Sequence, residues 1–499
     1  MTKKSEKVKI LMIESGSEME MGIPPNIATL VSSVKNSGFE INIFSTNEFR
    51  IFDKTGDDSR IGSLQVPPTS FNEMDIRYKD TDVIDDFILK VEEFRPDIIG
   101  LSTTEANYKI GLSLLKSIVK KDIFIIVGGA FAILSPETII KEDCIDAVCV
   151  GEGEVPLVEL CQSIQNQSIN YDISNIWFKK DGKIIRNKYS SLSDINLTPF
   201  QDWSEWDIPP RSFKPMAGKI RSTAIVELTR GCPFRCNYCA NHFLNEKFIH
   251  NYREKSIDRF IDEVEYLKKK YNVNFIYIAD ETILTTSEKR FLEFINQYKK
   301  VHLPFWCETR PEFITYEKIK MLKDVGMESI NVGLESGNED FRKNILNRYV
   351  SNDNIIRGIS EAIKADMRVG VNVIIGFPHE NRDLIFETIN LIREIKPTST
   401  MVHLFQPYVR TPLREECIKI GIIDKDYICG DYRMDAIGTK ELSKQEILGL
   451  HRTFNLYVDL PKDRWEEIKK AENLNDRGDI VFRKLAKEYQ LKHFGKTSF

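Results

Sequence analysis

Apolar residues in the first third of the chain gather in short runs separated by longer amphipathic stretches. The runs predict buried strands at KILMIES, INIFST, DIIGLSTT, IFIIVGG and IDAVCVGE, and stretches such as IATLVSSVKNSGF and DDFILKVEEF have the apolar spacing of helices. Strands that alternate with helices are typical of a parallel sheet with helices on both faces. We therefore expect residues 1–165 to form an α/β domain with a doubly wound parallel sheet.

The same alternation returns in residues 219–425. Here strands are predicted at AIVELTRG, FIYIAD, FWCETR, SINVGLES, VGVNVIIGFP and MVHLFQPY, with amphipathic helices between them. This order predicts a partial or complete parallel β/α barrel. Because such barrels carry their chemistry at the carboxyl ends of the strands, the loops that follow these strands are the candidate sites.

Two other segments lack this alternation. Residues 166–218 contain SNIWFKKDGKIIRNKYS, which predicts a hairpin turning at Asp181 and Gly182, and then the proline-bearing stretch INLTPFQDWSEWDIPPR. We interpret them as a linker with a hairpin. Residues 426–499 are polar, and KQEILGLHRTFNLYV and VFRKLAKEYQLKHF predict amphipathic helices, so a helical C-terminal region is expected.

Composition narrows the class of protein. Hydrophobic residues make up 41% and charged residues 29% of the 499 residues, as in ordinary globular proteins, and the net charge of -5 argues against nucleic acid as a partner. The first apolar run is too short for a signal sequence, and no transmembrane segment is predicted. Nine cysteines, six of them scattered singly, do not resemble a secreted disulfide framework, so we expect a cytoplasmic protein.

Three cysteines occur within eight residues of the segment ELTRGCPFRCNYCANHF. Cys232, Cys236 and Cys239 directly follow the first predicted barrel strand, on a loop where a barrel places its active site. Three thiolates can ligate three irons of a cubane cluster and leave the fourth iron open to a substrate or cofactor. The alternative is a zinc site, in which His242 would complete a Cys3His set.

The CxxxCxxC spacing after a first barrel strand resembles the signature of the radical S-adenosylmethionine (SAM) superfamily. The segments IADET, CETRPEFI, NVGLESGNEDF and VNVIIGFPHE resemble later parts of the same barrel, and FQPYVRTPL resembles the family's PYPGTPL element with departures at Val409 and Arg410. The resemblance covers roughly residues 220–415. It implies a [4Fe-4S] cluster on the three cysteines and SAM bound beside it.

The same resemblance implies a set of SAM-binding residues. Taken singly, each also fits a structural role, such as a helix cap or a strand end, and only their order along one barrel favours the family. The implied residues are Tyr238, Asp280, Glu308, Arg310, Glu335, Gly376, Phe377 and Pro378.

Several strands of the first domain end in small or polar residues, and ligands of open α/β sheets bind outside the carboxyl ends of the strands. The segments IPPNIATLVSSVKNSGFEINIF, RPDIIGLSTT, FIIVGGAFAILSPE, VCVGEGE and LTPFQDWS resemble the cobalamin-binding domain that precedes the barrel in one branch of the superfamily. Glycines at this edge leave room for a large ring. The resemblance implies cobalamin binding by Ser15, Ser102, Thr103, Thr104, Gly128, Gly129, Ala130, Gly151 and Gly153. A sheet that binds nothing is the alternative.

The cobalamin resemblance lacks one feature. Many cobalamin domains ligate cobalt through a histidine of a DxHxxG motif, and this chain has no histidine before His242. The resemblance is to the branch that normally lacks this motif, which leaves the lower face of the cofactor to its own base, to water or to nothing.

The implied activity is that of a radical SAM enzyme. SAM would be cleaved to a 5'-deoxyadenosyl radical, and methylcobalamin would methylate an unactivated carbon of a small-molecule, lipid or peptide substrate. The alternatives are cyclisation, oxidation or rearrangement with the same cofactors, a radical SAM enzyme with an empty N-terminal domain, and a zinc-stabilised binding protein. An external electron donor such as flavodoxin or ferredoxin is the expected partner. The sequence assigns no catalytic side chain.

Overall fold

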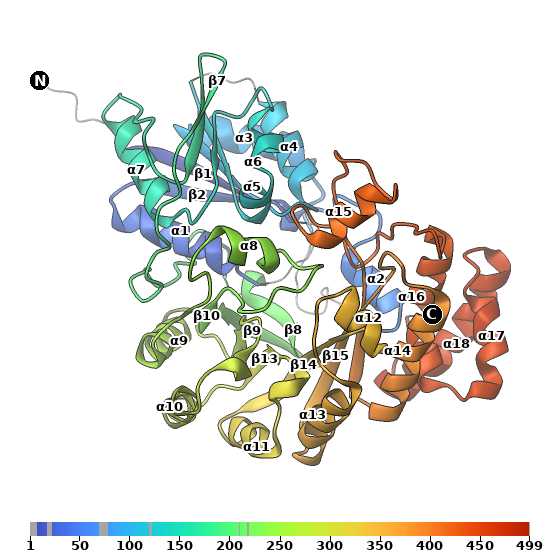
Figure 1. Cartoon of the computed structure of the whole chain (residues 1–499). Coiled ribbons are helices and arrows are strands. Elements are labelled where there is room, and N and C mark those ends of the chain that lie inside the picture. Colours follow the sequence, from blue (N-terminus) through green and yellow to red (C-terminus); the bar gives the residue numbers. More distant parts are fainter. Residues whose placement is uncertain are drawn as a thin grey trace, which may run out of the picture.

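The computed structural model describes residues 7–16, 22–68, 78–118, 122–208, 210–216 and 219–498. Within these ranges the chain builds two seven-stranded sheets and a group of helices beside the second sheet (Figure 1). None of the helices in these ranges is both long enough and apolar enough to cross a membrane.

The N-terminal sheet has the strand order β2-β1-β3-β4-β5-β6-β7, and its first five strands are parallel. The order in which successive strands join the sheet reverses at β1, because β2 lies on one side of it and β3 to β5 lie on the other, as in a doubly wound sheet. The parallel strands are β1 (Lys9–Glu14), β2 (Glu40–Ser45), β3 (Ile98–Ser102), β4 (Phe124–Gly128) and β5 (Ala147–Cys149). The helices of this half are α1 (Pro25–Asn36), α2 (Gly56–Gly62), α3 (Val83–Phe94), α4 (Tyr108–Ser117), α5 (Ala130–Leu134), α6 (Pro136–Ile140) and α7 (Glu154–Gln165).

Alternate residues of β1 face two different cores. Ile10 and Met12 belong to the apolar cluster that includes α1, whereas Leu11 and Ile13 pack with residues of α3 and α4. A strand buried on both faces is apolar along its whole length, which explains why its sequence is a continuous run and not an alternation.

The predicted hairpin exists and turns at Asp181 and Gly182, between β6 (Ile176–Lys180) and β7 (Lys183–Arg186). It pairs antiparallel with β5 and forms the edge of the N-terminal sheet. This part of residues 166–218 is thus a piece of the first sheet. The following boundary, at residue 219, adjoins residues 217–218, which lie outside the described residues.

The second sheet has the order β16-β15-β14-β13-β12-β9-β8, with six parallel strands and an antiparallel β8 at one edge. It is a partial barrel, as the sequence predicts. The strands are β8 (Phe213–Met216), β9 (Lys219–Val226), β12 (Phe275–Ile278), β13 (Phe305–Thr309), β14 (Met327–Glu335), β15 (Arg368–Ile375) and β16 (Ser399–Leu404).

Polar caps set where the barrel helices begin. The residue before each helix is a Ser, Thr or Asn whose side chain accepts a hydrogen bond from a backbone N–H of the first turn. These helices are α9 (Ile257–Tyr271), α10 (Glu288–Tyr298), α11 (Tyr316–Asp324), α12 (Glu339–Asn344), α13 (Asn352–Lys364) and α14 (Arg382–Ile395). Between β9 and α9 lie the short pair β10 (Thr229–Arg230) and β11 (Arg253–Glu254) and the helix α8 (Asn241–Lys247).

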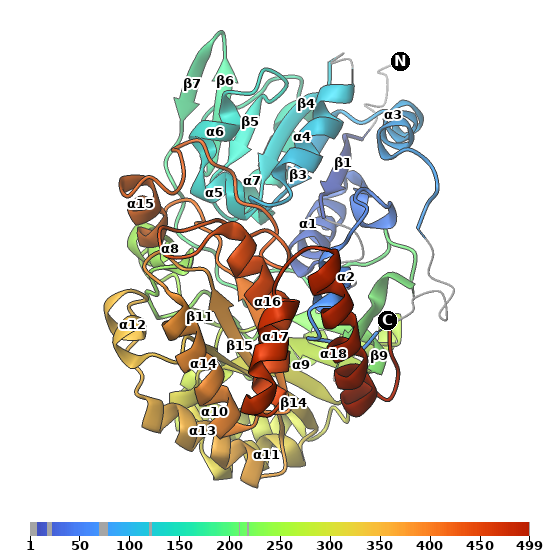
Figure 2. The ribbon, with the colours of Figure 1, turned by 90° about the vertical axis from the view of Figure 1, so that its right-hand side faces the viewer.

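The C-terminal region, residues 426–499, is helical, as predicted, with α16 (Lys444–Asp459), α17 (Trp465–Ala471) and α18 (Asp476–Phe494); α15 (Pro412–Lys419) precedes it, within the range predicted for the barrel. Figure 2 shows α2 of the N-terminal half lying beside these helices. Just after α2, the Gln65 side chain bonds to both backbone groups of Val402 on edge strand β16: its Nε2 donates to the Val402 oxygen at 3.1 Å, and its Oε1 accepts from the Val402 nitrogen at 3.0 Å. The N-terminal half therefore covers the open edge of the barrel.

Candidate functional site

A cavity of about 650 Å³ lies between the two sheets. The residues that line it follow the carboxyl ends of strands in both halves, which is where both folds place their ligands. The first half and the linker contribute Ile133, Gly151, Glu152 and Leu192. The segment from β10 through α8 to β11 contributes Arg230, Gly231, Tyr238, Cys239, Ala240, Asn241, Leu244, Phe248, Asn251 and Arg253. The carboxyl ends of other barrel strands and the chain after β16 contribute Glu281, Ile374, His403, Leu404, Phe405, Gln406, Tyr408 and Tyr432.

The three cysteines lie on one loop between β10 and α8. Asn245 holds this loop, because its Nδ2 donates to the carbonyl oxygens of Cys232 and Phe234 at 2.8 and 2.9 Å. The Cys239 nitrogen donates to the Cys236 oxygen at 3.1 Å. These bonds fix the backbone from which all three thiols project.

Two polar groups approach the sulfur atoms. Arg310 Nη1 lies 3.8 Å from the Sγ of Cys236, and Asn241 Nδ2 lies 3.7 Å from the Sγ of Cys239. Burial raises the pKa of the Cys232 thiol to about 11 and that of Cys239 to about 12. Because metals bind thiolates, occupation of this loop by iron would release these protons.

His242 has partners other than the cysteines. Its Nδ1 lies 3.0 Å from the carbonyl oxygen of Arg235, and its Nε2 lies 3.4 Å from the Glu246 carboxylate. No group of three or more His, Cys, Asp or Glu among the described residues is placed to hold a single metal ion. A single zinc ion needs four converging ligands, whereas a cubane takes one thiolate for each of three irons. The donor set therefore fits a cluster better than zinc.

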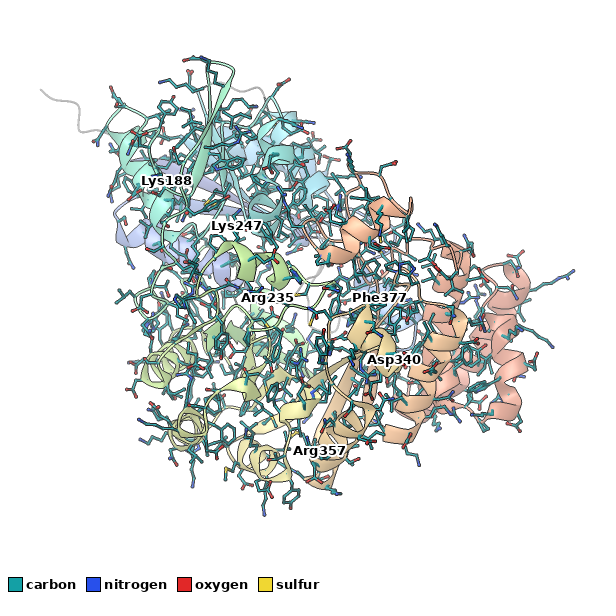
Figure 3. All side chains as sticks on the ribbon, in the orientation of Figure 1. Lys188, Arg235, Lys247, Asp340, Arg357 and Phe377 are labelled. Atoms are coloured by element: carbon teal, nitrogen blue, oxygen red, sulfur yellow. The ribbon has the colours of Figure 1, made fainter. Side chains whose placement is uncertain are left out.

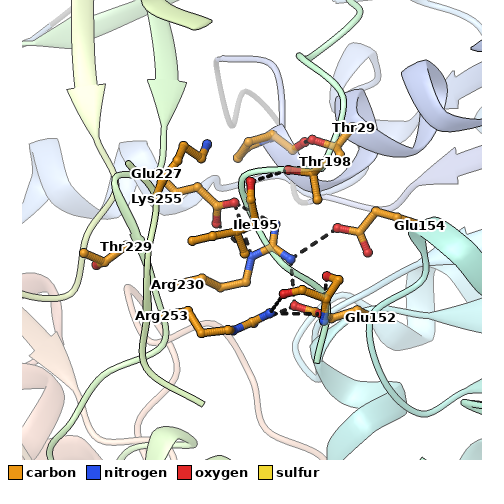
Figure 4. A network of polar contacts seen from close by, with 12 residues as sticks. Thr29, Glu152, Glu154, Ile195, Thr198, Glu227, Thr229, Arg230, Arg253 and Lys255 are labelled. Atoms are coloured by element: carbon orange, nitrogen blue, oxygen red, sulfur yellow. Dashed lines mark hydrogen bonds and ion pairs between the residues drawn. The ribbon is translucent and has the colours of Figure 1, made fainter. Parts of the chain in front are cut away.

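The cysteine loop is attached to the N-terminal domain through Glu152 (Figure 4). Its Oε1 accepts hydrogen bonds from Arg230 Nη1 at 2.7 Å and from Arg253 Nη2 at 2.6 Å, and its Oε2 accepts from the backbone and hydroxyl of Ser193. Arg230 is also paired with Glu227 and Glu154. These cations hold the pKa of Glu152 at about 2 in spite of its burial, which acts in the opposite direction.

Asp280 supports the start of the loop. Its Oδ1 accepts from the backbone nitrogens of Leu228 and Thr229 at 2.8 and 2.9 Å. Burial raises its pKa to about 7. Asp280 does not line the cavity, whereas the next residue, Glu281, does.

Glu335, another predicted SAM contact, has a strained backbone with φ 70°, in the left-handed region that non-glycine residues rarely adopt. Its carboxylate lies 3.9 Å from Arg348, and burial raises its pKa. Tyr238 hydrogen-bonds the same carboxylate and lines the cavity. Backbone strain of this kind gathers at functional sites.

The remaining predicted SAM contacts lie behind the cavity wall. Burial raises the pKa of Glu308 to about 7, with neighbouring carboxylates acting in the same direction. Gly376 and Phe377 donate backbone hydrogen bonds to Glu380 at 2.7 and 3.3 Å, and the Phe377 ring packs 5.8 Å from that of Tyr238. Of the predicted SAM contacts, Glu308, Arg310, Gly376, Phe377 and Pro378 do not line the cavity.

Polar groups at the sheet edge of the first domain bond to each other. Ser15 Oγ donates to Thr103 Oγ1 at 2.9 Å and lies 3.2 Å from the Ser102 carbonyl. Gly129 has φ 92°, and a Cβ there would meet the Thr103 carbonyl oxygen at 2.6 Å, so packing demands this glycine. Of the nine predicted cobalamin contacts, only Gly151 lines the cavity; Ser15, Ser102, Thr103, Thr104, Gly128, Gly129, Ala130 and Gly153 do not.

Sequence reasoning missed the wall formed by β16 and the chain after it. His403, on β16, faces this cavity; burial lowers its pKa to about 3, and its Nδ1 has no hydrogen-bond partner among the described residues. Gln406, Tyr408 and Tyr432 lie on the same wall. Single polar residues on a barrel strand carry no motif, so their only signal was their position at a strand end. Sequence reasoning also missed Glu152, although it lies between Gly151 and Gly153, which are predicted cobalamin contacts.

Comparison with known proteins agrees with this geometry. Residues 226–392 match the radical SAM superfamily, and residues 69–161 match the B12 binding domain. An uncharacterized methyltransferase of Pyrococcus horikoshii is 26% identical over 67% of this chain and 72% of its own length. The anaerobic magnesium-protoporphyrin IX monomethyl ester cyclase of Rubrivivax gelatinosus is 25% identical over 73% of this chain and 67% of its own length.

The fold is also similar to a solved structure. The cobalamin-dependent SAM radical enzyme OxsB superposes with a TM-score of 0.66 at 15% identity, covering 98% of this chain and 72% of that one. The predicted fold class is thereby confirmed, with a parallel-sheet domain, a partial barrel and C-terminal helices. The chain therefore belongs to the radical SAM superfamily, in the branch that carries a B12-binding domain ahead of the barrel.

Proposed function

We propose that this protein is a cobalamin-dependent radical SAM enzyme that methylates an unactivated carbon of a small-molecule, lipid or peptide substrate. One observation carries the proposal. The cysteine loop and the ligand edge of the N-terminal sheet meet at the same cavity, so a cluster, SAM and cobalamin would act on one substrate there. When bound, the reduced cluster supplies the electron that cleaves SAM, and cobalamin supplies the methyl group.

Cys232, Cys236 and Cys239 would hold the cluster. The loop fits this group because its three thiols share one backbone segment and, among the described residues, no His, Cys, Asp or Glu is grouped with them as a further metal ligand. Arg310 and Asn241 stand near two of the sulfur atoms and would donate hydrogen bonds to them, which is one way in which proteins tune clusters.

The N-terminal wall of the cavity fits a large ring. Ile133 and Gly151 present an apolar and a side-chain-free surface there, and no histidine precedes His242 in the sequence. Cobalamin would therefore lie against this wall without a histidine of the N-terminal domain on cobalt. Loading the protein with cobalamin and recording its optical spectrum tests this point, because a spectrum with a protein nitrogen on cobalt contradicts it.

The remaining residues position these groups. Tyr238, Glu335 and Arg348 form a hydrogen-bonded and ionic cluster beside the loop, suited to the amino and carboxylate groups of SAM. Apolar side chains such as Leu244 and Phe405 line the cavity and exclude water from it. We keep an external electron donor and a cytoplasmic location as parts of this proposal, since the cluster needs electrons and reduced thiols.

Ring formation with the same cofactors is the second candidate. The observation that favours it is the similarity to the magnesium-protoporphyrin cyclase. The alignment with the Pyrococcus horikoshii methyltransferase covers 72% of that protein, whereas the alignment with the cyclase covers 67% of the cyclase. We therefore place methylation first.

The test is reconstitution without oxygen, followed by addition of SAM, dithionite and methylcobalamin. Mass spectrometry should detect 5'-deoxyadenosine and a stoichiometric corrinoid in the wild type. Cys236→Ala should form no 5'-deoxyadenosine, whereas Cys144→Ala, in the first domain, should behave as the wild type. A nucleoside without bound corrinoid would contradict the cobalamin half of the proposal, and zinc without nucleoside would contradict all of it.

A further inference from the structure

A second cavity, of about 360 Å³, adjoins the first, and Ile133 lines both. Its walls come from the N-terminal sheet, α6, α8 and the turn after β16. Its lining includes Glu137, Trp177, Tyr189, Phe243, Lys247 and Arg410.

Lys247 carries a positive charge into this second cavity. Its Nζ lies 4.2 Å from the ring centre of Tyr189, 5.0 Å from that of Phe243 and 5.8 Å from that of Phe248. Figure 3 shows it between α8 and the N-terminal sheet. Among the described residues Lys247 has no hydrogen-bond or ion-pair partner; aromatic rings lie around its charge, and Arg410 and Glu137 act on it electrostatically.

Arg410 is the second cation, and its backbone is unusual. Its φ of 66° lies in the left-handed region, and it occupies the place of the glycine in the PYPGTPL element that this segment resembles. An arginine there bears a steric cost that glycine avoids. An observed backbone outlier of this kind justifies a search for a function of its side chain.

The Arg410 side chain extends toward the N-terminal half. Nε donates to the Leu134 oxygen at 3.2 Å, and Nη2 lies 3.3 Å from Glu137 Oε2. The other carboxylate at this cavity, Glu246, is 3.4 Å from His242. Both carboxylates thus have other partners, and among the described residues neither forms an ion pair with Lys247.

Burial, with Arg410 acting in the same direction, lowers the pKa of Lys247 to about 8, while Glu137 acts weakly against this shift. A bound anion would favour the charged amine. Trp177 and Phe243 offer flat apolar surfaces next to the two cations. The cavity therefore combines a place for a negative group with a place for a flat apolar group.

We propose that this second cavity binds an anionic group, a phosphate or a carboxylate, that a substrate carries next to a flat apolar portion, while the reacting carbon lies in the first cavity. This inference rests on the proposed function, because the bound molecule is a substrate only if the protein is the enzyme proposed above. It adds the chemical class of that substrate. Lys247 and Arg410 are the specificity-determining residues.

The test is calorimetric titration of the reconstituted full-length protein with phenyl phosphate. We expect binding that weakens about tenfold or more in Lys247→Met and in Arg410→Gly, because each loses a charge-assisted contact. Phenol, which lacks the anion, and inorganic phosphate, which lacks the ring, should each bind more weakly than phenyl phosphate. Lys364→Met, which changes a lysine at the end of another helix, should bind like the wild type.

Two outcomes overturn the inference. One is an affinity for phenyl phosphate that is absent, or that is unchanged in both Lys247→Met and Arg410→Gly. The other is binding only in protein free of cobalamin, which would assign the site to the phosphate of the cofactor itself. Thermal melting checks the fold of each variant, and Lys247→Met suffices if Arg410→Gly does not fold. Because the titration needs no SAM cleavage, its failure is distinct from failure of the proposed function.

Discussion

Glu152 and Arg253 join the two halves of the molecule through two hydrogen bonds, of 2.6 and 3.2 Å. Glu152 follows β5 of the N-terminal sheet, and Arg253 lies on β11, beyond the cysteine loop. Since Glu152 also accepts from Arg230, on β10, one carboxylate holds both strands that flank the loop. The domain that would bind cobalamin thus fixes the position of the loop that would bind the cluster.

This pairing predicts a pH-dependent loss of stability in Glu152→Gln. The pKa of Glu152 is lowered from 4.5 to about 2, so the ionised group stabilises the fold above pH 4.5 by roughly 3 kcal/mol, and this contribution disappears as the pH falls toward 2. At pH 7 the variant should melt about 3 °C below the wild type, because a chain of 499 residues unfolds with an entropy of roughly 1 kcal/mol/K.

Melting curves between pH 7 and pH 3 measure this effect. The gap between Glu152→Gln and the wild type should shrink as the pH falls below 4.5. Glu361→Gln, which disturbs a surface pair with Lys364, serves as the control and should melt within about 1 °C of the wild type at all pH values. A gap of constant size would mean that Glu152 contributes through shape and not through charge.

A glycine at the cysteine loop gives a prediction about iron binding. Gly231 has φ 83°, and a Cβ there would lie 2.5 Å from the backbone oxygen of Asn251. Gly182 has φ 72° with nothing within 4 Å of a Cβ. Gly182→Ala should therefore cost only the conformational strain of about 1–2 kcal/mol. Gly231→Ala carries the same strain and must also displace the backbone beside Cys232.

Iron content after reconstitution separates the two variants. Gly231→Ala should bind less than half of the iron of the wild type, whereas Gly182→Ala should bind the full amount. Equal iron in both variants would show that the loop accommodates the extra methyl group without moving the cysteines.

The buried pair of Glu105 and Arg414 links the N-terminal sheet to the turn after β16. Glu105 accepts from Arg414 Nη1 at 3.3 Å and from the backbone nitrogens of Val409 and Cys429, both at 3.1 Å. Glu105→Ala leaves the arginine buried without its carboxylate, which typically costs about 3–5 kcal/mol. Chemical denaturation should show this loss, and a loss below about 1 kcal/mol would mean that water reaches Arg414 in the variant.

Much of this fold could be predicted from the sequence because its signals are local. Most of the parallel strands in the two sheets contain a short apolar run, and the cysteine motif is confined to a few residues, Cys232 to Cys239. The hairpin at Asp181 was also predicted, but its pairing with β5 was not, because nothing in its own sequence specifies a partner strand.

The site was harder to predict, because it depends on contacts between distant segments. Asp280 is predicted to contact SAM, and the structure adds a role that spacing did not indicate, because its Oδ1 holds backbone nitrogens at the start of the loop. His403 entered the cavity wall only because the two sheets face each other there. Contacts of this kind arise from the packing of distant segments, and neither composition nor the spacing of motifs predicts them.

The contact between Gln65 and Val402 supports a last prediction, about the edge of the barrel. Edge strands carry free backbone groups that invite pairing with other chains, and proteins cover them in various ways. Here the Gln65 amide supplies both a donor and an acceptor to β16, and its Nε2 also lies 3.1 Å from His451 Nε2 on α16. Its exposed fraction is 5%, so water does not take its place.

Gln65→Met keeps the size of the side chain and removes its hydrogen bonds. The Val402 nitrogen would then be buried without a partner, at about 1–3 kcal/mol, whereas the Val402 oxygen keeps its contact with His451 Nε2 at 3.1 Å, so the variant should melt below the wild type. Gln297→Met, which loses one exposed bond to Asp258, is the matched control and should be nearly neutral. Light scattering at the onset of melting tests the role of the edge: aggregation of Gln65→Met should begin before its helices unfold, whereas simultaneous loss of both signals would reduce Gln65 to an ordinary stabilising contact.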